Sequence, residues 1–202
     1  MSAVEDFIRS EIEGKILKIL KEIEELHEEI VEDWSSKIGV SKPNIVVTLE
    51  EVNECSSPYV CIQDSDNYCK VITGDYIPDT KTIVLYYRSN IDSLLHLFLH
   101  HVYASQIGFD KYRQIKYIET IRLPWSLRPT EIRILAMTKK MYNVLVTQRT
   151  GKIWTDYIKT RIRMLDEEIQ KVSSTVRSFA SSVMPSVHMR QLAYKVSRED
   201  KT

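Results

Sequence analysis

The stretch Ser89-Asn-Ile-Asp-Ser-Leu-Leu-His-Leu-Phe-Leu-His-His-Val-Tyr103 decides how the rest of the chain is arranged. Its apolar residues recur with a period near 3.6, the pattern of an amphipathic helix. They are Ile91, Leu94, Leu95, Phe98, Leu99 and Val102. Ser89 is placed to cap this helix, with Asp92 three residues later. The pattern puts His96 and His100 on roughly the side opposite the apolar stripe.

The residues before this helix predict a small mixed or antiparallel sheet. The segments rich in β-branched and aromatic residues, each bounded by turn residues, are expected to form its strands. They are Asn44–Val52, Tyr59–Ile62, Cys69–Thr73 and Thr82–Tyr87. Gly74 and Pro78 indicate a loop before the last strand.

The residues after the helix predict two further helices. The first covers Lys111 to Arg122, and the second begins near Pro129, since proline is favoured at the first helical position, and reaches Val146. Gly151 is expected to end this region. The fold class is therefore α+β.

Two long heptad-patterned segments flank this centre. The first is a helix from Val4 to Lys37, with a weak point at Gly14 and a seam of isoleucines and leucines. The second runs from Trp154 to Pro185 with unbroken steps of four and three. Its seam is Ile158, Ile162, Leu165, Ile169, Val172, Val176, Phe179 and Val183. These helices either pack on the core or form a coiled arm that binds a second copy or a protein partner.

The 202 residues suit one domain of ordinary size with extensions. The expected parts are an N-terminal helix (1–37), an α+β core (38–148) and a C-terminal helix with a polar tail (149–202). No apolar run is long enough to cross a bilayer, and the N-terminus is acidic. We therefore expect an intracellular, cytoplasmic location.

Charge is unevenly distributed although the formal net charge is zero. Residues 1–34 have 11 acidic and 4 basic side chains, whereas residues 111–202 have 8 acidic and 19 basic ones. One interpretation is that an acidic N-terminal helix packs near a basic C-terminal one. The other is nucleic-acid binding by the basic half. Its stacking surfaces would be Tyr112, Tyr117, Trp125 and Trp154.

Three cysteines, Cys55, Cys61 and Cys69, lack the short C-x2-C spacing of structural zinc sites. Three thiols are expected, with one disulfide as the alternative.

His96 and His100 have the spacing at which two imidazoles on one helix face can both bind zinc. The stretch Leu94–His101, after the strand Thr82–Tyr87 and before Leu123–Ala136, resembles the small archaeal zincin-like metallopeptidases. The resemblance covers about residues 45–143. It implies a zincin-like core and three zinc ligands, His96, His100 and Glu131. Arg128, which precedes Glu131 in the same motif, is the candidate for a side chain that supports the ligands.

Leu97 stands where the family has its catalytic glutamate, the residue that activates water for attack. A leucine cannot accept a proton, and general-base catalysis contributes roughly 10²–10⁴-fold. Glu119 and Asp110 are the nearby acidic alternatives, and the spacing favours neither.

The sequence therefore leaves three alternative functions open. The chain is a catalytically impaired zincin-like protein that retains zinc and has no catalytic residue, or a metal-free structural protein that assembles through its heptad helices, or a nucleic-acid-binding protein.

Overall fold

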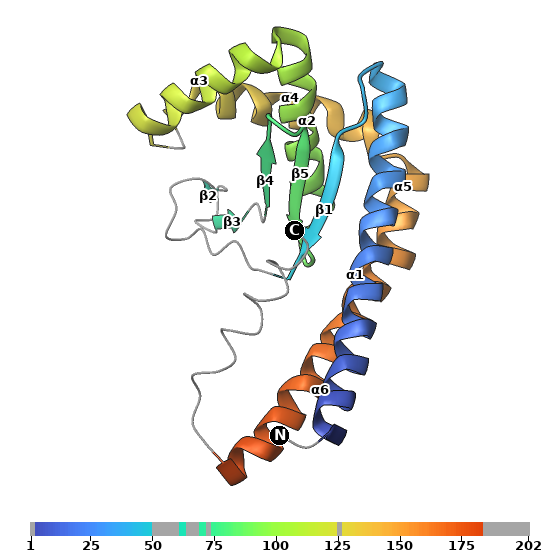
Figure 1. Cartoon of the computed structure of the whole chain (residues 1–202). Coiled ribbons are helices and arrows are strands. Elements are labelled where there is room, and N and C mark those ends of the chain that lie inside the picture. The colour runs from blue at the N-terminus through green and yellow to red at the C-terminus, as the bar shows by residue number, and fades with distance from the viewer. Residues whose placement is uncertain (1–2, 50–60, 64–68, 72–73, 125–126, 184–202) are drawn as a thin grey trace.

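The computed structural model describes residues 3–49, 61–63, 69–71, 74–124 and 127–183. The fold is α+β and mostly helical, with a small three-stranded mixed sheet, which confirms the predicted fold class (Figure 1). The helices are α1 (Ala3–Ile38), α2 (Ile91–Ile107), α3 (Phe109–Arg122), α4 (Pro129–Leu145), α5 (Gln148–Lys152), the π-helix η2 (Ile153–Ile158) and α6 (Lys159–Val183). The strands are β1 (Asn44–Thr48), β2 (Cys61–Gln63), β3 (Cys69–Val71), β4 (Gly74–Ile77) and β5 (Thr82–Tyr86).

The three-stranded sheet has the order β1-β5-β4. β1 runs parallel to β5, with Asn44 opposite Thr82, and β4 is antiparallel to β5. The prediction of a loop from Gly74 to Pro78 was wrong, because Gly74–Ile77 forms strand β4. Gly74 is the first residue of this strand. Glycine is needed there, because any Cβ atom would collide with the carbonyl oxygen of Val84.

β2 and β3 form a separate antiparallel pair. Their register places Cys61 opposite Val71 and Cys69 opposite Gln63, so the two cysteines do not face each other directly. Cys55 lies outside the described residues.

Helix α2 packs on β4 and β5 and also contacts α3 and α4. Its cap is Asn90, whose side chain accepts a hydrogen bond from the backbone N–H of Ser93 at 2.8 Å. The predicted cap, Ser89, was one residue too early. His96 and His100 do lie away from the sheet-facing stripe, but α4 covers that side, so both imidazoles are buried. The helix is therefore enclosed on both faces.

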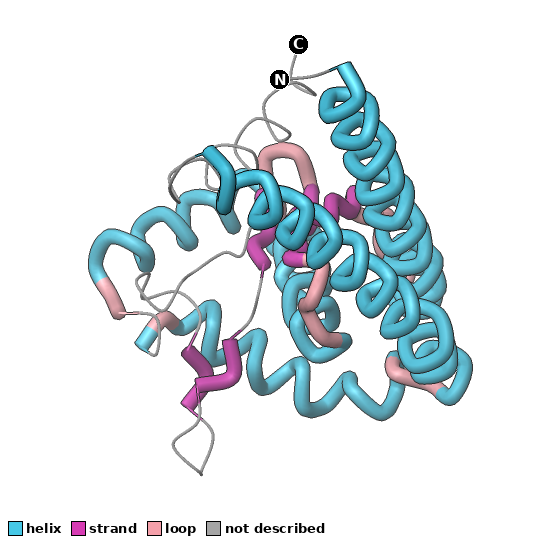
Figure 2. Tube along the Cα trace, turned by 90° about the horizontal axis from the view of Figure 1, so that it is seen from below, coloured by secondary structure: helices cyan, strands magenta, loops and turns pink. Residues whose placement is uncertain are grey.

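Helices α1 and α6 run antiparallel, side by side along one flank of the molecule (Figures 1 and 2). Gly14 does not interrupt α1. Acidic residues of α1 pair with basic residues from the C-terminal half: Glu22 with Arg161, at 2.5 Å, and Glu29 with Arg149, at 2.8 Å. These contacts support the interpretation that the acidic and basic ends of the chain pack together.

The beginning of the second heptad seam is buried inside the molecule. Ile158 and Leu165 are fully buried, and Ile162 and Ile169 pack against the same hydrophobic cluster. The chain is helical without a break from Gln148 to Val183, so Gly151, the predicted end of the preceding region, lies within α5 instead. The side chains of Val172 to Val183 lie outside the described part of the structure.

Among the described residues, one hydrophobic cluster connects the terminal helices with the sheet and α2. At its centre, Trp34 of α1 packs against Phe98 of α2, with ring centroids 5.5 Å apart. The indole N–H of Trp34 also donates to the carbonyl oxygen of Leu145 at 2.8 Å. Because that carbonyl is at the C-terminal end of α4, it has no partner within the helix, and it accepts from Trp34 together with the backbone N–H of Thr147 at 2.9 Å. Trp34 thus connects α1, α2 and α4.

The backbone of each outer strand of the sheet makes a hydrogen bond with a side chain of a helix. The backbone N–H of Val47 in β1 donates to the carboxylate of Glu24 in α1 at 3.0 Å. On the other side, Lys116 of α3 donates to the carbonyl oxygen of Tyr76 in β4 at 3.1 Å.

Among the described residues, no helix combines the length and the apolar character needed to cross a membrane.

Candidate metal centre

His96, His100 and Glu131 come together from two helices at the centre of the molecule. The first two are one turn apart on α2, and Glu131 is in the first turn of α4, which packs across α2. All three side chains are buried. The fold thus brings together the three residues that the sequence motif singles out, although Glu131 lies 31 positions after His100.

The three potential ligand atoms form a nearly regular triangle. The two Nε2 atoms of His96 and His100 are 3.0 Å apart. Oε2 of Glu131 lies 3.3 Å from Nε2 of His96 and 3.2 Å from Nε2 of His100. In a tetrahedral zinc site with bonds of about 2.0–2.1 Å, neighbouring ligand atoms are about 3.3 Å apart. The triangle therefore has the dimensions that zinc requires.

The chemistry of these atoms also fits a divalent cation. Two imidazole nitrogens and one carboxylate oxygen are a ligand set that zinc takes in sites with three protein ligands. Oε2 of Glu131 is buried and makes no hydrogen bond of ordinary geometry in the described structure. A buried carboxylate oxygen without such a partner is costly, because it has lost its contacts with water. A cation bound between the three residues would compensate for that loss.

The local electrostatics favour the protonation states that bind a metal. Burial lowers the pKa of His96 to about 4, which keeps its imidazole neutral at pH 7. Burial raises the pKa of Glu131, but the contacts with His100 and His96 outweigh this effect and hold it well below its usual range. A neutral imidazole and an ionised carboxylate are the forms that donate electron pairs to zinc.

The turn between α3 and α4 positions Glu131. Glu119, near the end of α3, accepts hydrogen bonds from the backbone N–H and the hydroxyl of Thr130 at 3.0–3.3 Å. Its carboxylate thus caps the start of α4, where it also complements the helix dipole. Glu119 is buried and occupied in this contact, so the geometry does not place it as a general base.

Arg128 is buried beside the same turn. Its guanidinium donates to the carbonyl oxygens of Leu123, at 3.1 Å, and Thr120, at 3.4 Å. These bonds connect the residue before α4 with the end of α3, so Arg128 fixes the position from which α4 begins. Asp110, the other acidic alternative, is exposed and forms an ion pair with Arg113 at 2.6 Å.

Leu97 is buried between α2 and the sheet, only 4% exposed. A Cβ atom at Gly74 in β4 would lie 2.8 Å from Cδ1 of Leu97, so the leucine fills the space that the glycine leaves. The position at which the resembling peptidases have their glutamate is thus an apolar contact here. No polar side chain replaces the glutamate at that place on α2.

The hydroxyl of Tyr112 lies 2.6 Å from Nδ1 of His100, a contact that the sequence pattern does not predict. No spacing rule reveals this contact, because it depends on how α3 crosses α2. Tyr112 and Trp154, two of the predicted stacking surfaces for nucleic acid, are both buried and therefore cannot stack on bases. Tyr117 is exposed, and Trp125 lies outside the described residues.

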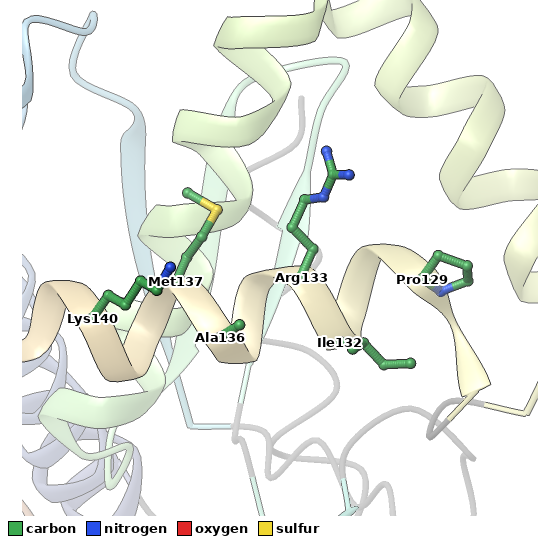
Figure 3. Close-up of a pocket in the computed structure, with 6 residues that line it drawn as sticks. All are labelled: Pro129, Ile132, Arg133, Ala136, Met137 and Lys140. Atoms are coloured by element: carbon green, nitrogen blue, oxygen red, sulfur yellow. The ribbon is translucent and has the colours of Figure 1, made fainter.

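A pocket of about 500 Å³ lies along α4 (Figure 3). It is lined by Pro129, Ile132, Arg133, Ala136, Met137 and Lys140. At about 100° per residue, these positions centre on the side of α4 opposite Glu131. This pocket therefore does not lead to the three ligand residues.

Comparisons with protein-family models, with curated proteins and with solved structures found no match to this chain.

Proposed function

We propose that this chain binds one zinc ion through His96, His100 and Glu131 and is a catalytically impaired relative of the zincin-like metallopeptidases. The observation that carries the proposal is the buried triangle of ligand atoms, with edges of 3.0, 3.2 and 3.3 Å. Two elements distant in sequence contribute to it, which makes a chance meeting of polar residues a poor explanation.

A zinc ion in such a site acts as a Lewis acid and lowers the pKa of a water molecule. Among the residues that the structure describes, none is placed to complete that chemistry. Leu97 offers no proton acceptor, Glu119 caps α4, and Asp110 pairs with Arg113 on the surface. We therefore propose that the metal connects α2 with α4 and that peptide hydrolysis is lost.

Elemental analysis of protein purified without a histidine tag tests the metal. We expect close to one zinc per chain after incubation with zinc and removal of the excess. His96→Ala and His100→Ala should each lose it. His101→Gln is a matched control, because His101 is a buried histidine of the same helix whose ring nitrogens contact Tyr76 and the carbonyl of Ser41 instead.

Wild-type protein that holds no zinc or other divalent metal under these conditions would remove the proposal. Equal metal loss in His101→Gln would show that the variants had lost their fold rather than a ligand.

A further inference from the structure

Tyr112 of α3 is fully buried, and its hydroxyl contacts a proposed metal ligand. The phenol oxygen is 2.6 Å from Nδ1 of His100, while Nε2 of the same ring points into the cluster of His96 and Glu131. The two ring nitrogens of His100 thus have different surroundings: Nε2 faces the proposed metal position and Nδ1 faces Tyr112.

His96 lacks an equivalent support. Its Nδ1 atom is buried and has no hydrogen-bond partner in the part of the chain that the structure describes. Ligating histidines usually donate their second N–H to a fixed acceptor, which orients the ring. Between the two histidines, His100 is therefore the one whose ring is fixed in advance.

A tyrosine hydroxyl can both donate and accept, whereas a carbonyl or carboxylate only accepts. Without a metal, the hydroxyl proton of Tyr112 is satisfied by donation to Nδ1 of His100, its hydrogen-bond partner among the described residues. The ring proton of His100 then resides on Nε2, which lies 3.0 Å from Nε2 of His96 and 3.2 Å from Oε2 of Glu131. A proton on Nε2 of His100 leaves the lone pair on Nδ1, which then accepts from Tyr112.

A metal at Nε2 requires the opposite arrangement, because Nε2 must offer its lone pair. The imidazole proton then resides on Nδ1 and is donated to the oxygen of Tyr112. The imidazole of His100 loses no proton in this exchange, because the proton leaves Nε2 and one is bound at Nδ1 instead. Only the direction of the hydrogen bond to Tyr112 reverses.

We infer that Tyr112 is a positioning residue that holds the ring of His100 in both states, as a donor without metal and as an acceptor with metal. The inference rests on the proposed zinc site. It explains how a buried histidine keeps a satisfied Nδ1 before and after a metal binds.

The first test compares Tyr112→Phe with Tyr76→Phe. Tyr76 is a matched control, because it is equally buried, packs edge-on against Tyr112, and bonds to His101, at 3.0 Å, instead of a proposed ligand. We expect both variants to lose thermal stability. Competition with a chromophoric chelator should show zinc binding about 10–100-fold weaker in Tyr112→Phe alone.

The second measurement uses the wild-type protein, so it does not depend on a variant that folds. Nitrogen-15 NMR of the histidine side chains distinguishes a proton on Nε2 from one on Nδ1. We expect His100 to have the proton on Nε2 in metal-free protein and on Nδ1 after zinc is added.

The outcomes separate the two proposals. Wild-type protein that binds no zinc removes the proposed function. Zinc binding that is strong in wild type and equally strong in Tyr112→Phe overturns the positioning role. A proton on Nδ1 of His100 in both states overturns the reversal of the hydrogen bond.

Discussion

Leu97 is the residue at which the proposed metal site and the proposed loss of catalysis can be tested separately. It follows His96 directly, yet its side chain packs under β4 at Gly74 and does not belong to the ligand cluster. The ligand triangle therefore does not depend on the identity of residue 97. Under the proposed function, the loss of a general base at position 97 leaves the three ligand side chains in place.

We expect Leu97→Glu to lower stability and to restore some peptide hydrolysis in zinc-loaded protein. A carboxylate placed in this apolar contact loses its hydration, so we expect a cost of about 2–4 kcal/mol in the metal-free protein. Leu97→Gln is the matched control, because it has the same shape and cannot accept a proton. Chemical denaturation and a fluorogenic peptide assay measure the two effects.

Activity in Leu97→Gln equal to that of Leu97→Glu would contradict the explanation, as would a zinc-loaded Leu97→Glu variant with no activity at all.

His27 of α1 is a buried histidine outside the metal cluster. Its Nδ1 bonds to the carbonyl of Ile23 at 2.8 Å, its ring packs edge-on against Trp154, and its Nε2 has no partner among the described residues. Burial lowers the pKa of His27 from 6.5 to about 4. The folded protein therefore excludes a proton that the unfolded chain binds below about pH 6.5.

This difference makes the free energy of unfolding fall as the pH falls from about 6.5 to about 4. From the two pKa values we expect His27 to contribute a loss of about 2 kcal/mol between pH 7 and pH 5. His27→Asn should be less stable at pH 7 but lose that much less on acidification. Urea denaturation at both pH values, with chelator present, measures the difference. Identical pH dependence in the two proteins would show that His27 does not titrate in this way.

At the scale of elements, local patterns predicted the helices well and the short strands less well. The bounds of α1, α3 and α4 agree with their sequence signals to within one or two residues, because heptads and Pro129 are local features. β4 was not predicted, because Gly74–Ile77 forms a strand only by pairing with β5. Local sequence patterns do not reveal such a pairing. The same applies to Tyr112 and Glu119, whose roles depend on how α3 lies against α2 and α4.

The histidine pair was predictable in position but not in environment. A helical wheel places His96 and His100 opposite the apolar stripe, a place that normally faces solvent. Here α4 covers that side of α2, so the histidines are buried although the pattern around them is amphipathic. Burial of a polar face is thus a tertiary fact, and it converts an ordinary spacing of two histidines into a candidate site.

At the scale of the whole molecule, the heptad seam of α6 begins as internal packing. Leu165 is fully buried and Ile169 packs on the same cluster, while Asp166 between them accepts hydrogen bonds from Tyr87 and Arg88 at 2.7–3.1 Å. Both sets of contacts hold this part of α6 to its own chain. This portion of the seam is therefore not free to bind another copy.

Ile169→Asp should therefore lower stability, by about 1–3 kcal/mol, without changing the mass of the particle in solution. Met164→Asp is the matched control, because Met164 is on the same helix and 40% exposed. Light scattering over a range of concentrations measures the mass, and denaturation measures the stability. A dimer in the wild type that dissociates in Ile169→Asp would instead support assembly through the seam.

The side chains that meet the outer strands of the sheet have a consequence for growth of that sheet. An open strand edge offers backbone groups to which a further strand, from a peptide or from another molecule, can bind. On this protein Glu24 occupies an N–H of β1, and Lys116 occupies a carbonyl of β4. An extended peptide that approaches either edge must first displace a charged side chain. Strand addition is therefore disfavoured at both edges of the sheet.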